Sequence, residues 1–192
     1  MRFEKGHKEK TRKRILEVAS RRMRREGIAA SGIASIMNDA GLTNGAFYLH
    51  FDSKEALVRE AVESALSEQC EKLAAQGAEA RSIEDVIREY LKPSHVLDPD
   101  EGCPSAALLP ELGREPQPTR EAYEAGLLRY VSMLASYLPD PESEASRQRA
   151  IAVFGMMVGT LQLARGVSDV SLSGAILEGG AQAAISLAKL PL

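Results

Sequence analysis

The sequence predicts an all-α protein of about nine helices, in which a small head of three N-terminal helices precedes a larger helical body. Three observations favour this fold class. Apolar residues recur at helical spacing nearly throughout, alternating runs of β-branched residues are absent, and Gly or Pro interrupts the pattern between the predicted helices. With 192 residues and 44% hydrophobic composition, the chain is long enough to bury a core without disulfide or metal staples.

Residues 9–25 predict an amphipathic helix that ends at Gly27. Ile15, Ala19 and Met23 lie on one arc at helical spacing, whereas the opposite arc is basic. The basic side chains on that arc are Lys13, Arg14, Arg21, Arg24 and Arg25. We expect this basic face to attract phosphates without sequence preference.

Two short helices are expected next, at 32–40 and 43–51, with a glycine turn between them. Thr43 is the expected N-cap of the second one. Phe47 and Phe51 are four residues apart and can anchor that helix inward. A helix, a tight turn and a short helix form the helix-turn-helix arrangement, in which the second helix enters the major groove of DNA.

Six further helices are predicted in the body, with a loop at 95–102 that follows a stop at Pro93. These helices are expected at 53–75, 82–91, 103–112, 119–138, 142–165 and 171–190.

The net charge of −3 conceals an uneven distribution of charge. Residues 1–59 carry 13 basic and 7 acidic side chains, a net charge of +6, whereas residues 60–192 carry 11 and 20, a net charge of −9. A basic head joined to an acidic body is typical of a module that binds a polyanion, attached to a part that faces away from it.

Several other classes of protein are disfavoured. Cys70 and Cys103 are the only cysteines and form no CxxC pair or Cys/His cluster, so no disulfide framework, metal or cofactor is expected. The longest uncharged apolar run, 151–164, is short for a membrane span at 14 residues. The charged N-terminus lacks the apolar stretch of a signal peptide, so we expect a cytoplasmic protein with no membrane partner.

Residues 8–57 resemble the TetR/AcrR family of bacterial transcriptional regulators. The matching residues are Thr11-Arg12, Ile15-Leu16, Gly27, Ile36, Ala40-Gly41, Gly45-Ala46, Tyr48, His50-Phe51, Ser53-Lys54-Glu55 and Leu57. The resemblance implies a homodimeric repressor that binds a palindromic operator in double-stranded DNA and is released by a small-molecule effector. It divides the chain into a helix-turn-helix DNA-binding domain at 1–52 and a ligand-binding and dimerisation domain at 53–192.

Nine residues of the head are expected to contact DNA. Small side chains in the first turn of the 43–51 helix let its backbone approach the duplex, and neighbouring polar groups can donate to phosphates. By position, the groove-facing residues are Asn44, Gly45, Ala46 and Tyr48, and the phosphate contacts are Thr43, Tyr48, His50 and Lys54. Ser31 and Gly32 begin the preceding helix, where the family often has a hydroxyl that binds phosphate. Gly32 has no hydroxyl and so departs from the family pattern, and Ser31 is expected to make this phosphate contact alone.

Small residues inside the last two predicted helices indicate close helix packing, because a glycine within a helix costs up to about 1 kcal/mol relative to alanine. The residues expected at a dimer interface are Gly155, Gly159, Gly179 and Ala183. Ordinary packing within one chain is the alternative at this point. The resemblance favours an interface to which each subunit offers the same surface.

An effector pocket is expected among the middle helices. Its candidate lining residues, each of which also suits a hydrophobic core, are Tyr90, His95, Cys103, Tyr123, Tyr130, Met133, Phe154, Met157 and Gln162. Apolar walls with a few polar groups are typical of ligand pockets, and here they predict a hydrophobic or aromatic small molecule.

Two alternatives centre on Cys103. A thiol near a helix start can respond to electrophiles or oxidants, which would make the chain a thiol-sensing regulator. The other alternative is an all-helical enzyme that uses Cys103 or His95 as nucleophile or base, but the sequence shows no motif with a third group to orient such a base. We therefore do not expect an enzyme.

Overall fold

The computed structural model describes residues 5–77 and 82–190, and every regular element in these two ranges is a helix. The predicted all-α fold class is confirmed. The elements are α1 (Lys5–Glu26), α2 (Ile33–Asp39), the 3₁₀ helix η1 (Asn44–Leu49), α3 (Lys54–Gly77), α4 (Ile83–Tyr90), α5 (Pro93–Leu97), α6 (Pro104–Leu112), α7 (Gln117–Ala135), α8 (Glu144–Gly166) and α9 (Val170–Lys189).

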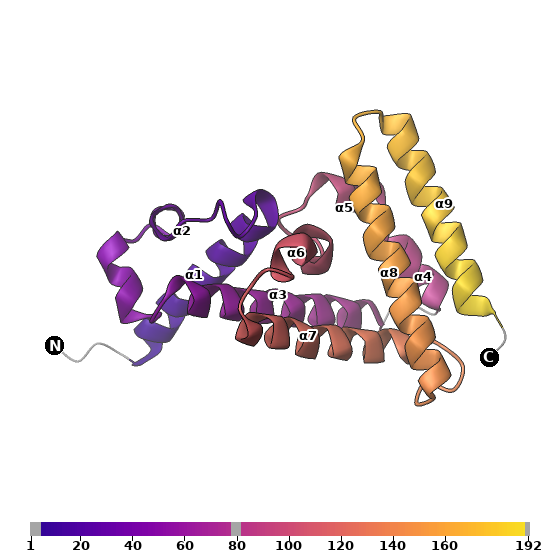
Figure 1. The fold of residues 1–192 in the computed structure, drawn as a ribbon, viewed down its shortest axis with the longest axis horizontal. Coiled ribbons are helices and arrows are strands. Elements are labelled where there is room, and N and C mark those ends of the chain that lie inside the picture. The colour runs from indigo at the N-terminus through magenta and orange to yellow at the C-terminus, as the bar shows by residue number, and fades with distance from the viewer. Residues whose placement is uncertain (1–4, 78–81, 191–192) are drawn as a thin grey trace.

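The molecule is elongated (Figure 1). The three elements of the head, α1, α2 and η1, gather at one end, and α8 and α9 pack together at the other. Between them α3 and α7 run side by side, so these two helices connect the head to the far end of the body. Within the described ranges, no helix combines the length and the apolar character needed to cross a bilayer.

The core of the head includes side chains from the body. Ile15 of α1 and Phe47 of η1 are fully buried in one cluster, and Phe51 is 3% exposed, so the two phenylalanines do anchor this segment inward. Leu108 and Leu112 of α6 belong to the same cluster. The head is therefore packed against α6 through shared apolar contacts as well as through the chain connection.

Two close helix crossings hold the body together. A Cβ added at Gly126 of α7 would lie 2.6 Å from Leu66 of α3, and one added at Gly180 of α9 would overlap Thr160 of α8. Glycine at these two positions therefore allows the paired backbones to approach each other more closely than any other residue would.

The predicted third helix of the head is a 3₁₀ helix and not an α-helix. Its N–H groups bond to carbonyls three residues earlier, from Ala46 to Thr43 and from His50 to Phe47. Thr43 occupies the expected N-cap position, but its side chain makes no capping hydrogen bond. The apolar spacing that predicted a helix is satisfied by either kind of helix over so short a segment.

The loop expected at 95–102 begins as a helix. Pro93, interpreted from the sequence as a stop signal, also starts the short helix α5. Proline fits the first helical position because its fixed φ suits a helix and its missing N–H has no partner there. The irregular segment is therefore shorter than predicted and begins at Asp98.

The C-terminal half of the basic face of α1 is occupied within the chain. Three of its arginines approach carboxylates of the body, and the pairs are Arg21 with Glu101 (2.8 Å), Arg24 with Glu68 (3.9 Å) and Arg25 with Asp100 (3.1 Å). These three arginines are therefore paired with the acidic body, and the expected attraction of phosphates by this half stays a prediction.

The turn after α1 is fixed by α6. Gly27 has a φ of +89°, and a Cβ there would lie 2.6 Å from the Glu111 carboxylate. That carboxylate accepts hydrogen bonds from the backbone N–H groups of Ile28 (3.1 Å) and Ala29 (2.9 Å). The Lys54 ammonium donates to the Ile28 carbonyl oxygen (3.2 Å). Charged groups from α6 and α3 thus hold the turn that sets the direction of α2.

We predict that Gly27→Ala lowers the free energy of unfolding by about 1–3 kcal/mol, because alanine is strained at positive φ and displaces the Glu111 carboxylate. Calorimetry should show a melting temperature lower by about 2–4 °C for each kcal/mol lost. Gly45→Ala is the matched control, since a Cβ at Gly45 would meet nothing within 4 Å. Equal melting temperatures for the two variants would contradict the prediction.

Candidate DNA-contact segment and effector cavity

An exposed segment at the tip of the head is the first candidate site. Tyr48 is 69% exposed although it is aromatic, and its ring meets Phe47 edge-on with centroids 5.1 Å apart. Thr43, Asn44 and Gly45 are exposed beside it. The buried Phe47 ring fixes the segment from within, so these four residues form a surface of small and polar groups around one aromatic ring.

The other predicted DNA contacts are more enclosed. Ser31 is fully buried and its hydroxyl donates to the Gly27 carbonyl oxygen (2.7 Å), while Gly32 and Ala46 are half-buried. Burial, together with the nearby charges of Lys8 and Arg12, lowers the pKa of His50. The predicted contact by Ser31 would require its hydroxyl to leave the Gly27 carbonyl.

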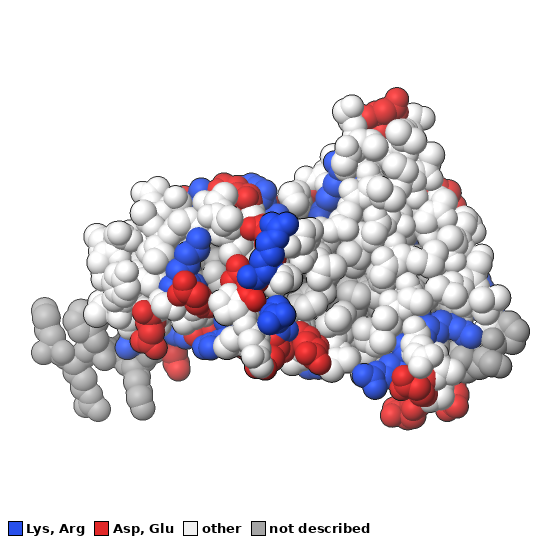
Figure 2. Space-filling model, in the orientation of Figure 1, with Lys and Arg blue, Asp and Glu red and all other residues white. Residues whose placement is uncertain are grey.

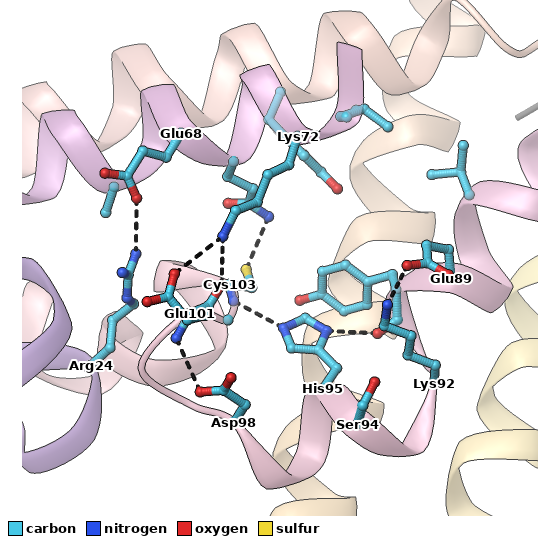
Figure 3. Close-up of a pocket in the computed structure, with 17 residues that line it drawn as sticks. Arg24, Glu68, Lys72, Glu89, Lys92, Ser94, His95, Asp98, Glu101 and Cys103 are labelled. Carbon is cyan, nitrogen blue, oxygen red and sulfur yellow. Dashed lines mark hydrogen bonds and ion pairs between the residues drawn. The ribbon is translucent and has the colours of Figure 1, made fainter. Parts of the chain in front are cut away.

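A cavity of about 330 Å³ in the body is the second candidate site (Figure 3). It is lined by residues of α1, α3, α4, α5 and α7 and of the segment 98–103 that precedes α6. Leu73 and Val86 give it apolar walls, and Tyr90 and Tyr130 add aromatic ones. Burial raises the pKa of the Tyr90 hydroxyl well above its usual value, so the hydroxyl stays protonated and remains a hydrogen-bond donor. The size suits a small organic molecule.

Charged side chains stand at one end of the cavity. Arg24 reaches it from α1, and burial lowers the pKa of the guanidinium. Lys72 of α3 donates to the Glu101 carbonyl oxygen (2.9 Å). Three buried polar atoms of lining residues, Arg24 Nε, Gln69 Oε1 and the Tyr90 hydroxyl oxygen, make no hydrogen bond within the described part of the chain. A guanidinium N–H donor, an amide oxygen acceptor and a hydroxyl are thus available to an occupant of the cavity.

His95 stabilises the part of the cavity wall next to Cys103 through two hydrogen bonds. The Cys103 N–H donates to His95 Nε2 (3.0 Å), so Nδ1 carries the proton and donates to the Tyr90 carbonyl oxygen (2.7 Å). Burial lowers the pKa of His95, and the charges of Arg165, Lys92 and Lys72 lower it further. A neutral imidazole with both nitrogens engaged therefore fixes the start of α6. The amide of Gln69 donates to Cys103 Sγ (3.1 Å).

The outer face of α8 and α9 is apolar and uncharged over most of its area (Figure 2). Gly155, Gly179 and Ala183 are exposed on it and Gly159 is half-buried. A Cβ at any of these three glycines would meet nothing within 4 Å, in contrast to Gly180. Packing within the chain therefore does not account for the small residues on this outer face.

The profile of a family described as "Bacterial regulatory proteins, tetR family" matches residues 15–61, which include α2, η1 and most of the head core. Over 87 residues the chain is 33% identical to the uncharacterized HTH-type transcriptional regulator YfiR of Bacillus subtilis. These two matches place residues 15–61, the helix-turn-helix part of the chain, in the tetR family.

These sequence matches cover only part of each protein. The YfiR alignment spans 45% of this chain and 42% of YfiR, and that with the HTH-type transcriptional regulator TtgR of Pseudomonas putida, 38% identical over 60 residues, spans 31% and 29%. The chain is thus aligned with less than half the length of these curated relatives.

The rest of the chain is similar to TetR-family proteins in fold. The reduced form of NemR from Escherichia coli superposes with a TM-score of 0.76 at 21% identity, covering 94% of this chain and 98% of NemR. FadR of Bacillus subtilis, solved in complex with stearoyl-CoA, superposes with a TM-score of 0.65 at 18% identity, covering 88% and 97%. Identities this low establish the fold and nothing finer.

Four of the nine predicted pocket residues line the cavity: Tyr90, His95, Cys103 and Tyr130. The other five lie elsewhere. Tyr123 donates to Ser105 Oγ and Gln162 to the Ala106 carbonyl oxygen, Phe154 packs on Tyr130, and Met133 and Met157 pack in the body core. These five were predicted from residue type, which does not distinguish a cavity wall from a core.

Sequence reasoning missed the charged lining residues, chiefly Arg24, Glu68, Lys72 and Glu101. Arg24 was placed on the basic face that was expected to attract phosphates, and the other three residues were assigned no role. The one available signal was the acidic segment 98–101, whose charge complements the arginines of α1. The cavity is therefore more polar at one end than the predicted hydrophobic pocket.

We predict that acid destabilises the protein partly through His95. Because the pKa of His95 is lower in the folded state, the unfolded state binds the proton first, so stability falls as the pH drops below about 6.5. His95→Gln should lose less stability between about pH 7.5 and about pH 5.5 than the parent protein. Urea midpoints at both pH values measure this loss. His7→Gln, at an exposed position, is the control and should match the parent, and an unchanged pH dependence in His95→Gln would count against the prediction.

Proposed function

We propose that the chain is a homodimeric DNA-binding transcriptional regulator, a repressor that a small molecule releases from a palindromic operator. The observation that carries this proposal is the exposed η1 segment around Tyr48, which lies inside the tetR-family match. This 69% exposed tyrosine presents an apolar ring and a hydroxyl that can form a hydrogen bond, which suits a contact surface. We assign Asn44, Gly45, Ala46 and Tyr48 to the groove and Thr43, Tyr48, His50 and Lys54 to phosphates.

Lys54 and Ser31 are half-buried and buried, and each already makes a hydrogen bond within the chain. Their contacts with phosphate therefore depend on the hydrogen-bond donors that remain. Lys54 donates one of its three protons to Ile28, so two remain for a phosphate. Ser31 joins the contacts only if its hydroxyl turns away from Gly27. We retain 1–52 as the DNA-binding domain and 53–192 as the ligand-binding and dimerisation domain.

The outer face of α8 and α9 is the proposed dimer interface. Its glycines allow close approach of a second helix pair, and few charges would need to lose their hydration there. A two-fold interface brings the same surface of each subunit together and relates the two heads by symmetry. The two η1 segments would then read half-sites about 34–36 Å apart.

The cavity is the proposed effector site. Aromatic walls together with the free Arg24 Nε–H and Gln69 Oε1 suit a small aromatic or apolar molecule that also carries polar groups. The effector would favour a dimer in which the head spacing no longer matches two successive major grooves.

A thiol sensor is the second candidate, favoured by the position of Cys103. Its thiol lines the cavity at the N-terminus of α6, so an electrophile bound there would meet the sulfur. Enzymatic use of Cys103 with His95 as base is not supported, because both ring nitrogens of His95 bond to backbone groups.

We predict that the protein binds the region upstream of its own gene more tightly than random DNA, and that Tyr48→Ala weakens this binding about 5- to 100-fold, as expected for loss of one contact. Gel-shift titrations at several salt concentrations measure both. Leu97→Ala removes an 82% exposed apolar side chain of α5, outside the assigned DNA contacts, and should bind as the parent does. Equal affinity and equal salt dependence on both DNAs would refute specific regulation.

We predict a dimer that Gly155→Glu with Ala183→Glu disrupts, because the interface would bury unpaired carboxylates. Sedimentation velocity should show the double variant shifted to monomer. Ala125→Glu adds a carboxylate at an exposed position of α7 and should remain dimeric. A double variant that sediments with the parent would place the interface elsewhere.

A further inference from the structure

Residues 98–103, which we name the strap, connect α5 to α6 and lie between the cavity and α1. Asp98, Glu101, Gly102 and Cys103 of the strap line the cavity (Figure 3). The strap therefore contacts the effector site on one side and the head on the other.

Two consecutive carboxylates attach the strap to α1. Glu101 Oε1 lies 2.8 Å from Arg21 Nε, and Asp100 Oδ2 lies 3.1 Å from Arg25 NH1. The two arginines are four residues apart and so lie one helical turn apart on the same side of α1. Two ion pairs on successive turns fix the strap along the helix axis as well as across it.

The body side of the strap is held by residues of the cavity wall. Lys72 donates to the Glu101 carbonyl oxygen and approaches the other carboxylate oxygen of Glu101 (3.8 Å). The Cys103 N–H is bound to His95. A Cβ at Gly102 would lie 2.9 Å from both His95 Nε2 and an Arg165 nitrogen, so the strap has no room to shift toward the cavity wall.

The Glu101 carboxylate is the junction of the two sides, because one oxygen faces Arg21 of the head and the other faces Lys72 of the cavity wall. We propose that the strap couples the cavity to the head, so that displacement of Lys72 or of the His95–Cys103 contact shifts the pairing of Arg21 and Arg25. The inference rests on the proposed function only in naming the effector as the agent that causes the displacement. The Glu111 contacts with Ile28 and Ala29 lie at the opposite end of α6 and do not involve the strap.

Because coupling acts in both directions, removing the ion pairs between the strap and α1 should also weaken the contacts between the strap and the cavity wall. Cys103 reports this, since it is only 3% exposed and its alkylation by a small electrophile becomes faster when the strap opens. In the full chain with Cys70→Ser, Cys103 is the only thiol. We expect Arg21→Gln with Arg25→Gln to accelerate alkylation of Cys103 by iodoacetamide about five- to tenfold, the range for loss of two partly exposed ion pairs.

The matched control is Lys10→Gln with Lys13→Gln, which removes two positive charges from α1 outside the strap contacts and should alkylate as the parent does. The urea midpoint of each variant separates opening of the strap from global unfolding. Faster alkylation at an unchanged midpoint supports the coupling. A rate equal to the control, or one that only follows the midpoint, overturns it.

Asp100→Asn provides a milder test if the double arginine variant does not fold. It removes one strap carboxylate, and a rise of about twofold in the alkylation rate is expected. An unchanged rate in this variant also overturns the coupling. These measurements need neither DNA nor effector, so a failure of specific DNA binding would contradict the proposed function and leave this result standing.

Discussion

Opposite charge between α1 and the body determines where the head lies. The sequence places an excess of arginine in the last turns of α1 and an excess of carboxylate in the body, and the fold brings them into contact at Arg21, Arg24 and Arg25. Exposed ion pairs of this kind are individually weak and are screened by salt. Several such ion pairs, together with the apolar contact with α6, hold the head against the body without making it rigid.

The fold followed from the sequence where periodicity is the deciding signal. Long helices such as α8 and α9 bury an apolar stripe that recurs every three or four residues, and that stripe is visible in the letters alone. The type of the η1 helix was not visible, because 3₁₀ and α hydrogen bonding satisfy the same short apolar pattern. Pro93 was ambiguous for a related reason, since proline both ends and begins helices.

The two candidate sites also differ in how far a local sequence pattern could predict them. The exposed face of η1 was predictable because Phe47 and Phe51 show which side is anchored. The charged end of the cavity was not, because the pairing of Arg24 with Glu68 and of Arg21 with Glu101 joins residues far apart in the chain. No local pattern indicates which of many surface charges will meet. The four predicted pocket residues that line the cavity stand near one another in the fold, whereas the five others were indistinguishable from core by type.

The shared core of the head limits how the chain can be divided for engineering. Leu57 and Ala61 of α3 and Leu108 and Leu112 of α6 pack in one cluster with Ile15 and Phe47. A fragment cut after residue 52 would lack all four of these apolar partners and would expose the side chains that they cover. The DNA-reading part is therefore not an interchangeable cassette. A chimera that kept its specificity would have to carry α3 and α6 with it, including the surface through which the body holds it.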